Sequence, residues 1–267
     1  MLHAYNGEKM KNQYYGDIND FKKYSLIRHL TGEGEIQITM CWALTENDEH
    51  KDGSRVNYLM EPPKWRKFDP IVFDQLRRDL LIKGERKVEN IELSNILANC
   101  RFFNQILKDD EKERDKFFQE FYEFSQDTDL IFLDPDNGLE IKSIPRGAGK
   151  SSKYVYWKEL LQLYNTGKSL LVYQHFPRRN REHFIDNITS KVFQIVGSSI
   201  VFLYITSNVL FILIPQKKHE RYFRKKNLTI SKNWKDLIIV KERSVYIYFK
   251  QFPVNTIITP HVEQFGT

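Results

Sequence analysis

A short apolar run that ends in acidic and turn-forming residues constrains this chain most. Leu130 to Leu133 carries no polar side chain, and the seven residues after it, Asp134 to Glu140, read DPDNGLE. An apolar run of this length is typical of a strand in the middle of a parallel sheet, where both faces are covered. Pro135 and Gly138 then end the strand. The pattern predicts an acidic cluster at the carboxyl end of a central strand, where open α/β sheets bind ligands.

Composition indicates a globular chain with a mild basic excess. Of the 267 residues, 41% are hydrophobic and 14% aromatic, which is enough for a substantial core. Lys and Arg outnumber Asp and Glu by 41 to 35, and the net charge of +6 favours anionic partners such as nucleic acid. Cys41 and Cys100 are the only cysteines, which excludes a disulfide framework or a cysteine-rich zinc site and fits a reducing compartment. With no run of about 18 apolar residues and no signal pattern, we expect a cytoplasmic protein without a membrane span.

Alternating helix and strand patterns predict an α/β fold. Asp17 is the expected cap of a helix that ends near Leu30, and Asp69-Pro70 opens a helix that runs to Gly84. Further patterns predict strands at 36–44, 87–93, 130–133 and 169–173, a hairpin of 200–205 with 208–214, and helices at 95–107, 111–124, 156–164 and 178–190. This order indicates a Rossmann-like, doubly wound, mostly parallel sheet followed by a C-terminal β-hairpin.

A change of composition after Pro215 predicts a domain boundary. Residues 1–215 are expected to form the Rossmann-like catalytic domain, and residues 216–267 a basic, β-containing C-terminal extension. Between positions 217 and 226 six Lys and Arg residues stand against Glu220 alone. A solvated helix or loop face explains such a run, and the interleaved Tyr222 and Phe223 also permit contact with nucleic acid.

Two motifs resemble a known family. Residues Tyr15 to Tyr24 (YGDINDFKKY) are similar to the Gly-Asn-x-x-Asp-x-x-Lys-His segment of the J-type large-subunit rRNA adenine-N6 methyltransferases. The DPDNGLE motif falls where that family carries Asp-Pro-Pro-Tyr-Glu. The chain also resembles a group of bacterial proteins that carry Tyr-x-Gly-Asp-x-x-Asp and DPDNGLE. The resemblance spans about residues 13 to 215 and implies a class I methyltransferase-type fold that uses S-adenosylmethionine.

The resemblance implies roles for particular residues. Asp20, Lys23 and Asn137 are expected at the cofactor, with Lys23 balancing carboxylate charge. Asp134, with the carbonyl of Pro135, is expected to accept hydrogen bonds from the exocyclic amine of a nucleic-acid base and so to orient its nitrogen toward the methyl donor. Asp136 joins Asp134 in the predicted catalytic group. His175, at the end of the predicted 169–173 strand, is a candidate general base, with a structural histidine as the alternative.

The sequence departs from the family at two places. The glycine-rich loop that follows the first strand of the family is replaced here by residues 45–53, in which Gly53 is the only glycine. The Pro-Tyr pair of the family motif is replaced by Asp136-Asn137, so an aromatic ring that stacks on a flipped base is exchanged for a charge.

A metal-dependent nuclease or phosphodiesterase is the alternative enzyme. Asp134, Asp136, Glu140 and Asp48 are its expected metal ligands, since clustered carboxylates repel one another unless a cation joins them. Oxygen ligands suit Mg or Mn, which promote displacement at phosphorus. The residues expected to hold phosphates in either enzyme are basic and lie in one loop: Lys142, Arg146, Lys150 and Lys153.

Two alternative interpretations of these motifs do not involve catalysis. The fold is also suited to a nucleotide- or nucleic-acid-binding module, for DNA or RNA, that lacks catalytic activity. The DPDNG residues are also those preferred in ordinary turns. The partner predicted under every functional reading is nucleic acid.

Overall fold

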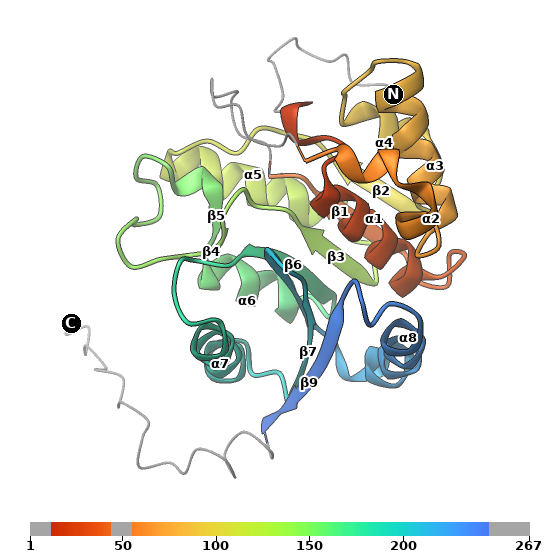
Figure 1. Cartoon of the computed structure of the whole chain (residues 1–267). Helices are drawn as coiled ribbons and strands as arrows, with labels where there is room; N and C mark the ends of the chain where they lie inside the picture. The colour runs from red at the N-terminus through yellow and green to blue at the C-terminus, as the bar shows by residue number, and fades with distance from the viewer. Residues whose placement is uncertain (1–11, 44–54, 246–267) are drawn as a thin grey trace, which may run out of the picture.

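A single mixed sheet of seven strands organises the part of the chain that the computed structural model describes, residues 12–43 and 55–245 (Figure 1). The strand order is β2-β1-β3-β6-β8-β7-β9. The strands are β1 (Ile38–Cys41), β2 (Cys100–Phe103), β3 (Leu130–Leu133), β6 (Ser169–His175), β7 (Ile200–Ile205), β8 (Val209–Ile214) and β9 (Ile239–Ser244). The β2, β1, β3 and β6 strands are parallel, whereas β8 runs antiparallel to β6 and β7, and β9 runs antiparallel to β7. The α/β prediction is confirmed, and the sheet is consistent with a Rossmann-like fold.

Helices cover both faces of the sheet (Figure 1). One face packs against α1 (Ile18–Thr31), α2 (Pro62–Trp65), α3 (Pro70–Arg77), α4 (Glu89–Leu93) and α8 (Glu220–Asn233). The other packs against α5 (Glu111–Phe124), α6 (Trp157–Asn165) and α7 (Arg181–Lys191). Successive residues of a strand point to opposite faces, so Leu130 and Phe132 belong to the first core and Ile131 and Leu133 to the second. The apolar run of β3 is therefore explained by burial on both sides.

The chain after β3 contributes to a second, two-stranded sheet. The β4 strand (Gly138–Leu139) pairs in parallel with β5 (Tyr154–Val155), and the residues between them form a loop at the side of the molecule (Figure 1). No helix within residues 12–43 and 55–245 is long and apolar enough to cross a membrane.

The region from 87 to 107 differs from its sequence-based prediction. The predicted strand 87–93 is wrong, because these residues contain helix α4. The predicted helix 95–107 is also wrong, because it contains β2. An edge strand has one neighbour and is only partly covered, and in β2 only Phe103 is buried. Such a strand has no continuous apolar run, so its hydrophobic pattern does not distinguish it from a helix.

The segment after Pro215 joins the same core. Helix α8 contributes Phe223 and Ile230 to the core on the α1 side of the sheet, and β9 extends the sheet beyond β7. The basic residues of α8 include Arg224, which pairs with Glu242 at 3.2 Å. The predicted boundary after residue 215 thus falls inside this sheet-and-helix unit, and the β7–β8 pair is not the last element of the sheet.

Candidate functional site

The site lies where the strand order reverses. The chain proceeds from β1 to β2 on one side and then returns to β3 on the other side of β1. Ligands of open α/β sheets bind outside the carboxyl ends of strands at such a point. Trp42 follows β1 directly, Asp134 follows β3 directly, and the amino-terminal half of α1 lies against both.

A buried lysine joins two carboxylates at this point. The Nζ atom of Lys23 lies 2.7 Å from Oδ2 of Asp134 and 2.7 Å from Oδ1 of Asp20. The Lys23 side chain is 7% exposed and that of Asp134 is 15% exposed. The three groups carry two negative charges and one positive charge, so the lysine balances only one carboxylate at a time.

Aromatic rings surround the Lys23 ammonium group. Its Nζ lies 5.0 Å from the ring centroid of Tyr24, 5.2 Å from that of Trp42 and 5.9 Å from that of Tyr173. The negative faces of such rings attract a cation within about 6 Å. Burial by itself lowers the pKa of Lys23, but the adjacent Asp134 and Asp20 raise it above its ordinary value. Lys23 therefore stays charged.

Asp134 and Asp17 ionise less readily than ordinary aspartates. Burial raises the pKa of Asp134 to about 6, and Lys23 opposes this shift while Asp20 and Asp136 add to it. Burial and the neighbouring Asp20 also raise the pKa of Asp17 to about 6. A carboxylate that titrates in this range is suited to functional use near neutral pH.

The YGDxxD motif has a local structural explanation. Asp17 caps α1 by accepting hydrogen bonds from the backbone N–H groups of Asn19 and Asp20. The backbone N–H of Gly16 donates to Asp20 Oδ2 at 3.0 Å, which fixes the carboxylate that holds Lys23. Gly16 has φ +78°, and a Cβ atom there would lie 2.7 Å from Leu80. The motif thus presents Asp20 and Lys23 from the first turns of the helix.

The DPDNG turn is fixed by the neighbouring strand. The Gln174 side-chain oxygen accepts from the N–H of Leu139 at 2.8 Å, and its amide nitrogen donates to the carbonyl of Asn137 at 3.0 Å. Gly138 has φ +112°, and the Gln174 amide fills the space that a Cβ atom would need. The backbone after Asp134 is therefore held against β6 rather than projecting as a free turn.

Asp136 and His175 lie at the same edge. Oδ2 of Asp136 is 3.9 Å from Nζ of Lys153, and Nε2 of His175 is 3.2 Å from the hydroxyl of Tyr173. Burial lowers the pKa of His175, while Asp136 opposes this shift and Arg55 and Lys23 add to it. His175 is therefore neutral at pH 7.

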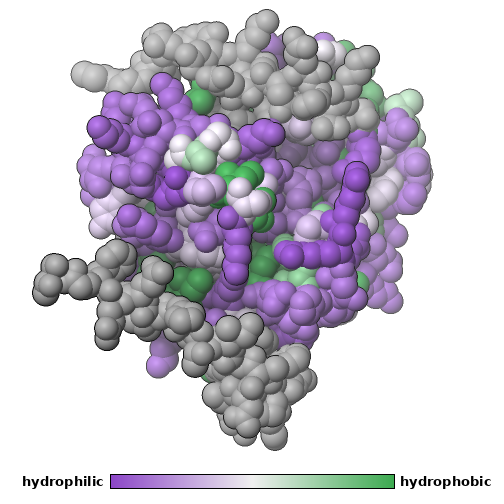
Figure 2. All heavy atoms as spheres, turned by 90° about the vertical axis from the view of Figure 1, so that its left-hand side faces the viewer, coloured by the Kyte–Doolittle hydropathy of each residue, from purple (hydrophilic) through white to green (hydrophobic). Residues whose placement is uncertain are grey.

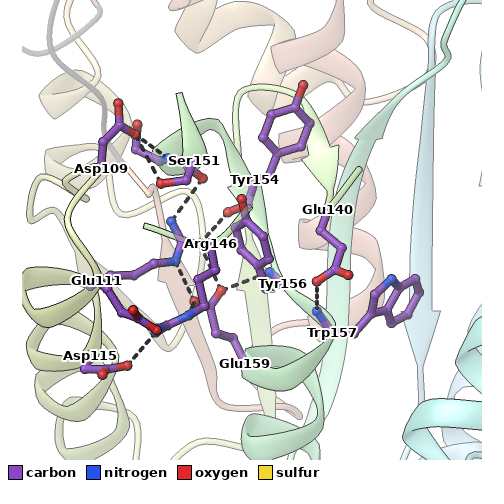
Figure 3. Close-up of polar contacts among 12 residues, drawn as sticks. Asp109, Glu111, Asp115, Glu140, Arg146, Ser151, Tyr154, Tyr156, Trp157 and Glu159 are labelled. Atoms are coloured by element: carbon purple, nitrogen blue, oxygen red, sulfur yellow. Dashed lines mark hydrogen bonds and ion pairs between the residues drawn. The ribbon is translucent and has the colours of Figure 1, made fainter. Parts of the chain in front are cut away.

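The Glu140 carboxylate is engaged at the start of α6. Its Oε2 accepts from the backbone N–H of Trp157 at 2.9 Å, at the start of α6 (Figure 3). Asp48 lies outside the described residues. Among the residues that are described, no three His, Cys, Asp or Glu side chains are placed to hold a metal ion together. The metal-ligand set stays a prediction, with Glu140 engaged in helix capping.

The predicted phosphate-binding residues have different surroundings. Arg146 forms ion pairs with Glu159 at 2.9 Å, Asp115 at 2.5 Å and Glu111 at 3.4 Å (Figure 3). This network attaches the loop to α5 and α6, so the guanidinium is engaged within the protein. The other three residues of the set are placed differently: Lys142 and Lys150 are exposed in the loop, and Lys153 lies beside Asp136.

Glu92 is a site residue that the sequence did not indicate. Its Oε1 accepts from the indole N–H of Trp42 at 2.8 Å, and its Oε2 lies 3.5 Å from the amide nitrogen of Asn104, just past β2. Burial raises the pKa of Glu92. Because residues 87–93 were predicted as a strand, the position of Glu92 near the ends of β1 and β2 was missed. A lone glutamate between Ile91 and Leu93 is the one signal that the sequence offers.

Comparisons with known proteins give no family. No protein-family model matches the chain, and no curated protein matches it. Among solved structures, the chain is similar to a protein of Legionella pneumophila strain Philadelphia 1 assigned to the family model DUF519. The similarity has 10% sequence identity and a TM-score of 0.45, and it covers 86% of this chain and 97% of that one. The resemblance to adenine-N6 methyltransferases stays a prediction.

Proposed function

We propose that the protein transfers a methyl group from S-adenosylmethionine to an amine of a nucleic-acid base. The observation that carries the proposal is the buried Asp20–Lys23–Asp134 group at the point where the strand order reverses. The sheet order adds support, because an antiparallel β8 between β6 and β7 agrees with the expected methyltransferase-type fold.

The residues near the strand ends fit the cofactor. Glu92 and Asn104, near the end of β2, offer acceptor oxygens suited to ribose hydroxyl groups. The Trp42 ring, just past β1, is suited to packing against the adenosine. Bound S-adenosylmethionine supplies an electrophilic methyl group. Asp20 and Lys23 then act from α1, where their charges are fixed before any ligand enters.

Asp134 is the proposed acceptor for the target amine. Its Oδ2 is held by Lys23, and no described residue forms a hydrogen bond with its Oδ1. A carboxylate oxygen fixed at a strand end accepts a hydrogen bond from the amine and directs the nitrogen lone pair. When the nitrogen gains a carbon it releases a proton, and the neutral His175 at the same edge is the proposed acceptor.

Cofactor binding tests the proposal directly. We expect titration calorimetry with S-adenosylmethionine to give heat, and Glu92→Gln to weaken binding about tenfold, which is about 1.4 kcal/mol. Glu89→Gln is the matched control, since Glu89 starts the same helix and is not part of the Trp42–Asn104 contact. Absence of heat with the wild-type protein would remove the transferase proposal.

The pH dependence follows from the raised pKa of Asp134. The amine acceptor must be ionised, so kcat/KM for methyl transfer should rise with pH through about 6 and then level off. Asp136→Asn removes a negative charge that raises this pKa, so the midpoint should shift to lower pH. The measurement is transfer of a labelled methyl group to RNA and to DNA between about pH 5 and 8. A profile without a titration near pH 6 would contradict the role of Asp134.

A further inference from the structure

A cavity lies on the side of the sheet that packs against α6 and α7, opposite the side covered by α1. It has a volume of about 380 Å³ and is bounded by β4, α6, α7 and the segment that follows β6. Figure 2 shows this side of the molecule, where apolar side chains lie in a hollow among hydrophilic ones. The volume falls within the range of small-molecule sites. Asp20, Lys23 and Asp134 do not line this pocket, whereas Asn137 and the proposed proton acceptor His175 do.

Aromatic rings form the pocket walls. Tyr154 lies on β5, Trp157 begins α6, Phe176 follows β6, and Phe184 lies on α7. Successive bases of single-stranded nucleic acid stack on aromatic side chains of this kind, whatever the base.

Two cations stand at the same pocket. The Arg179 guanidinium lies 4.8 Å from the ring centroid of Phe184, and Nζ of Lys191 lies 5.5 Å from that of Trp157. Within residues 12–43 and 55–245 neither side chain forms an ion pair. The Arg146 guanidinium, in contrast, is surrounded by carboxylates. Arg179 and Lys191 are therefore available to an anionic ligand, and a planar guanidinium suits a phosphate.

Polar side chains complete the lining, including His175 and Glu140, whose carboxylate accepts from the backbone N–H of Trp157. Asn187 lies on the same stripe of α7 as Phe184 and Lys191, and Asn137 enters from the DPDNG turn. Asparagine amides form paired hydrogen bonds with base edges. From the rings, the amides and the two cations that pair with no carboxylate of the described residues, we propose that this pocket binds a nucleoside monophosphate unit. Its base lies against the aromatic walls, and its phosphate contacts Arg179 and Lys191.

The proposal goes beyond methyl transfer and does not depend on it. Asn137 lies three residues after Asp134, so the DPDNG turn connects the pocket with the strand-end site. The unit is either a free nucleotide or one residue of a polynucleotide whose neighbouring base reaches the other site. A free nucleotide and a polynucleotide residue both present a base and a phosphate to the pocket.

Titration calorimetry with adenosine monophosphate tests the pocket. We expect measurable binding, weaker binding of adenosine without its phosphate, and a roughly tenfold loss of affinity for the nucleotide in Arg179→Gln and in Lys191→Gln. Lys158→Gln is the matched control, because Lys158 is exposed on α6 and does not line the pocket. If Lys158→Gln reduced affinity as much as the other two, the binding would be a general charge effect and the pocket proposal would be wrong.

A second experiment distinguishes a polynucleotide from a free nucleotide as the ligand of the pocket. A short single-stranded oligonucleotide that binds more tightly than the mononucleotide, competes with it and has a salt slope of about −0.7 per phosphate indicates a polynucleotide. Equal or weaker binding of the oligonucleotide indicates a free nucleotide. Asp134→Asn removes the proposed amine acceptor outside this pocket and should leave the affinity for adenosine monophosphate unchanged, so failure of methyl transfer and failure of this pocket are distinguishable. If neither probe binds the wild-type protein, the pocket proposal fails.

Discussion

Lys23→Met is expected to lower the free energy of unfolding by about 3–5 kcal/mol, because removal of one partner from a buried ion pair leaves a charge uncompensated. Lys23 contacts Asp20 and Asp134 at 2.7 Å each, and it is 7% exposed. Without the cation, the two carboxylates face each other across the same buried space. Methionine retains most of the unbranched side chain, so the loss reports charge more than packing. Urea denaturation at pH 7 measures it.

The neighbouring Lys22 provides the control. It lies in the same helix and is also buried, but its hydrogen-bond partner is the hydroxyl of Ser207 at 3.4 Å. Burial and the nearby Arg55 lower the pKa of Lys22, so its charge is not favoured where it lies. We therefore expect Lys22→Met to change stability by less than about 1 kcal/mol.

The pH dependence of the stability loss in Lys23→Met, together with a second substitution, shows whether the loss comes from the uncompensated carboxylate charges. In Lys23→Met the two uncompensated carboxylates should have higher pKa values in the folded state than in the unfolded state. Protonation relieves their repulsion at low pH, and this relief is lost as the pH rises. The deficit relative to wild type should be larger at about pH 8 than at about pH 5. Adding Asp134→Asn should restore part of the loss, because one of the two repelling charges is removed. Equal deficits in Lys22→Met and Lys23→Met would show that the ion pairs do not stabilise the fold.

The strand-end acid and the helix cap could be predicted because their causes are local. Leu130 to Leu133 is buried on both faces, and a proline follows within two residues. Asp17 caps α1 through backbone groups two and three positions along the chain. Pattern and turn chemistry operate over these short distances. The contact of Lys23 with Asp134 spans 111 positions, and only the family resemblance assigned the two residues to one site.

Other features depend on partners that no local pattern indicates. Arg146 was assigned to phosphate because it lies in a basic loop, but Glu159 and Asp115 reach it from two different helices. Glu92 lies at the site because it is near the end of β2, an edge strand that the sequence pattern does not predict. The basic run after residue 215 alternates with Phe223 and Ile230, which enter the core once α8 packs on the sheet. In each case tertiary packing decides the role, and composition alone does not.

Asp134→Asn is expected to reduce kcat for methyl transfer by about 10²–10³-fold, comparable to the loss of one preorganised polar contact to a reacting group. Lys23 has only donors, so the oxygen of the new amide will turn toward its Nζ, 2.7 Å from the present Oδ2. The NH₂ group then faces the position proposed for the target amine. Two donors oppose each other there, and the lone pair of the target nitrogen is no longer directed toward the methyl group.

The design of this experiment separates chemistry from folding and from cofactor affinity. Single-turnover transfer of a labelled methyl group measures the rate, and calorimetry should show unchanged S-adenosylmethionine affinity, because Asp134 is assigned to the target. Asp127→Asn is the matched control, since Asp127 is exposed before the amino end of the same strand. The urea transition of each variant confirms that it is folded. A rate within about threefold of wild type would mean that the Asp134 carboxylate does not position the amine, because the predicted loss is more than ten times larger.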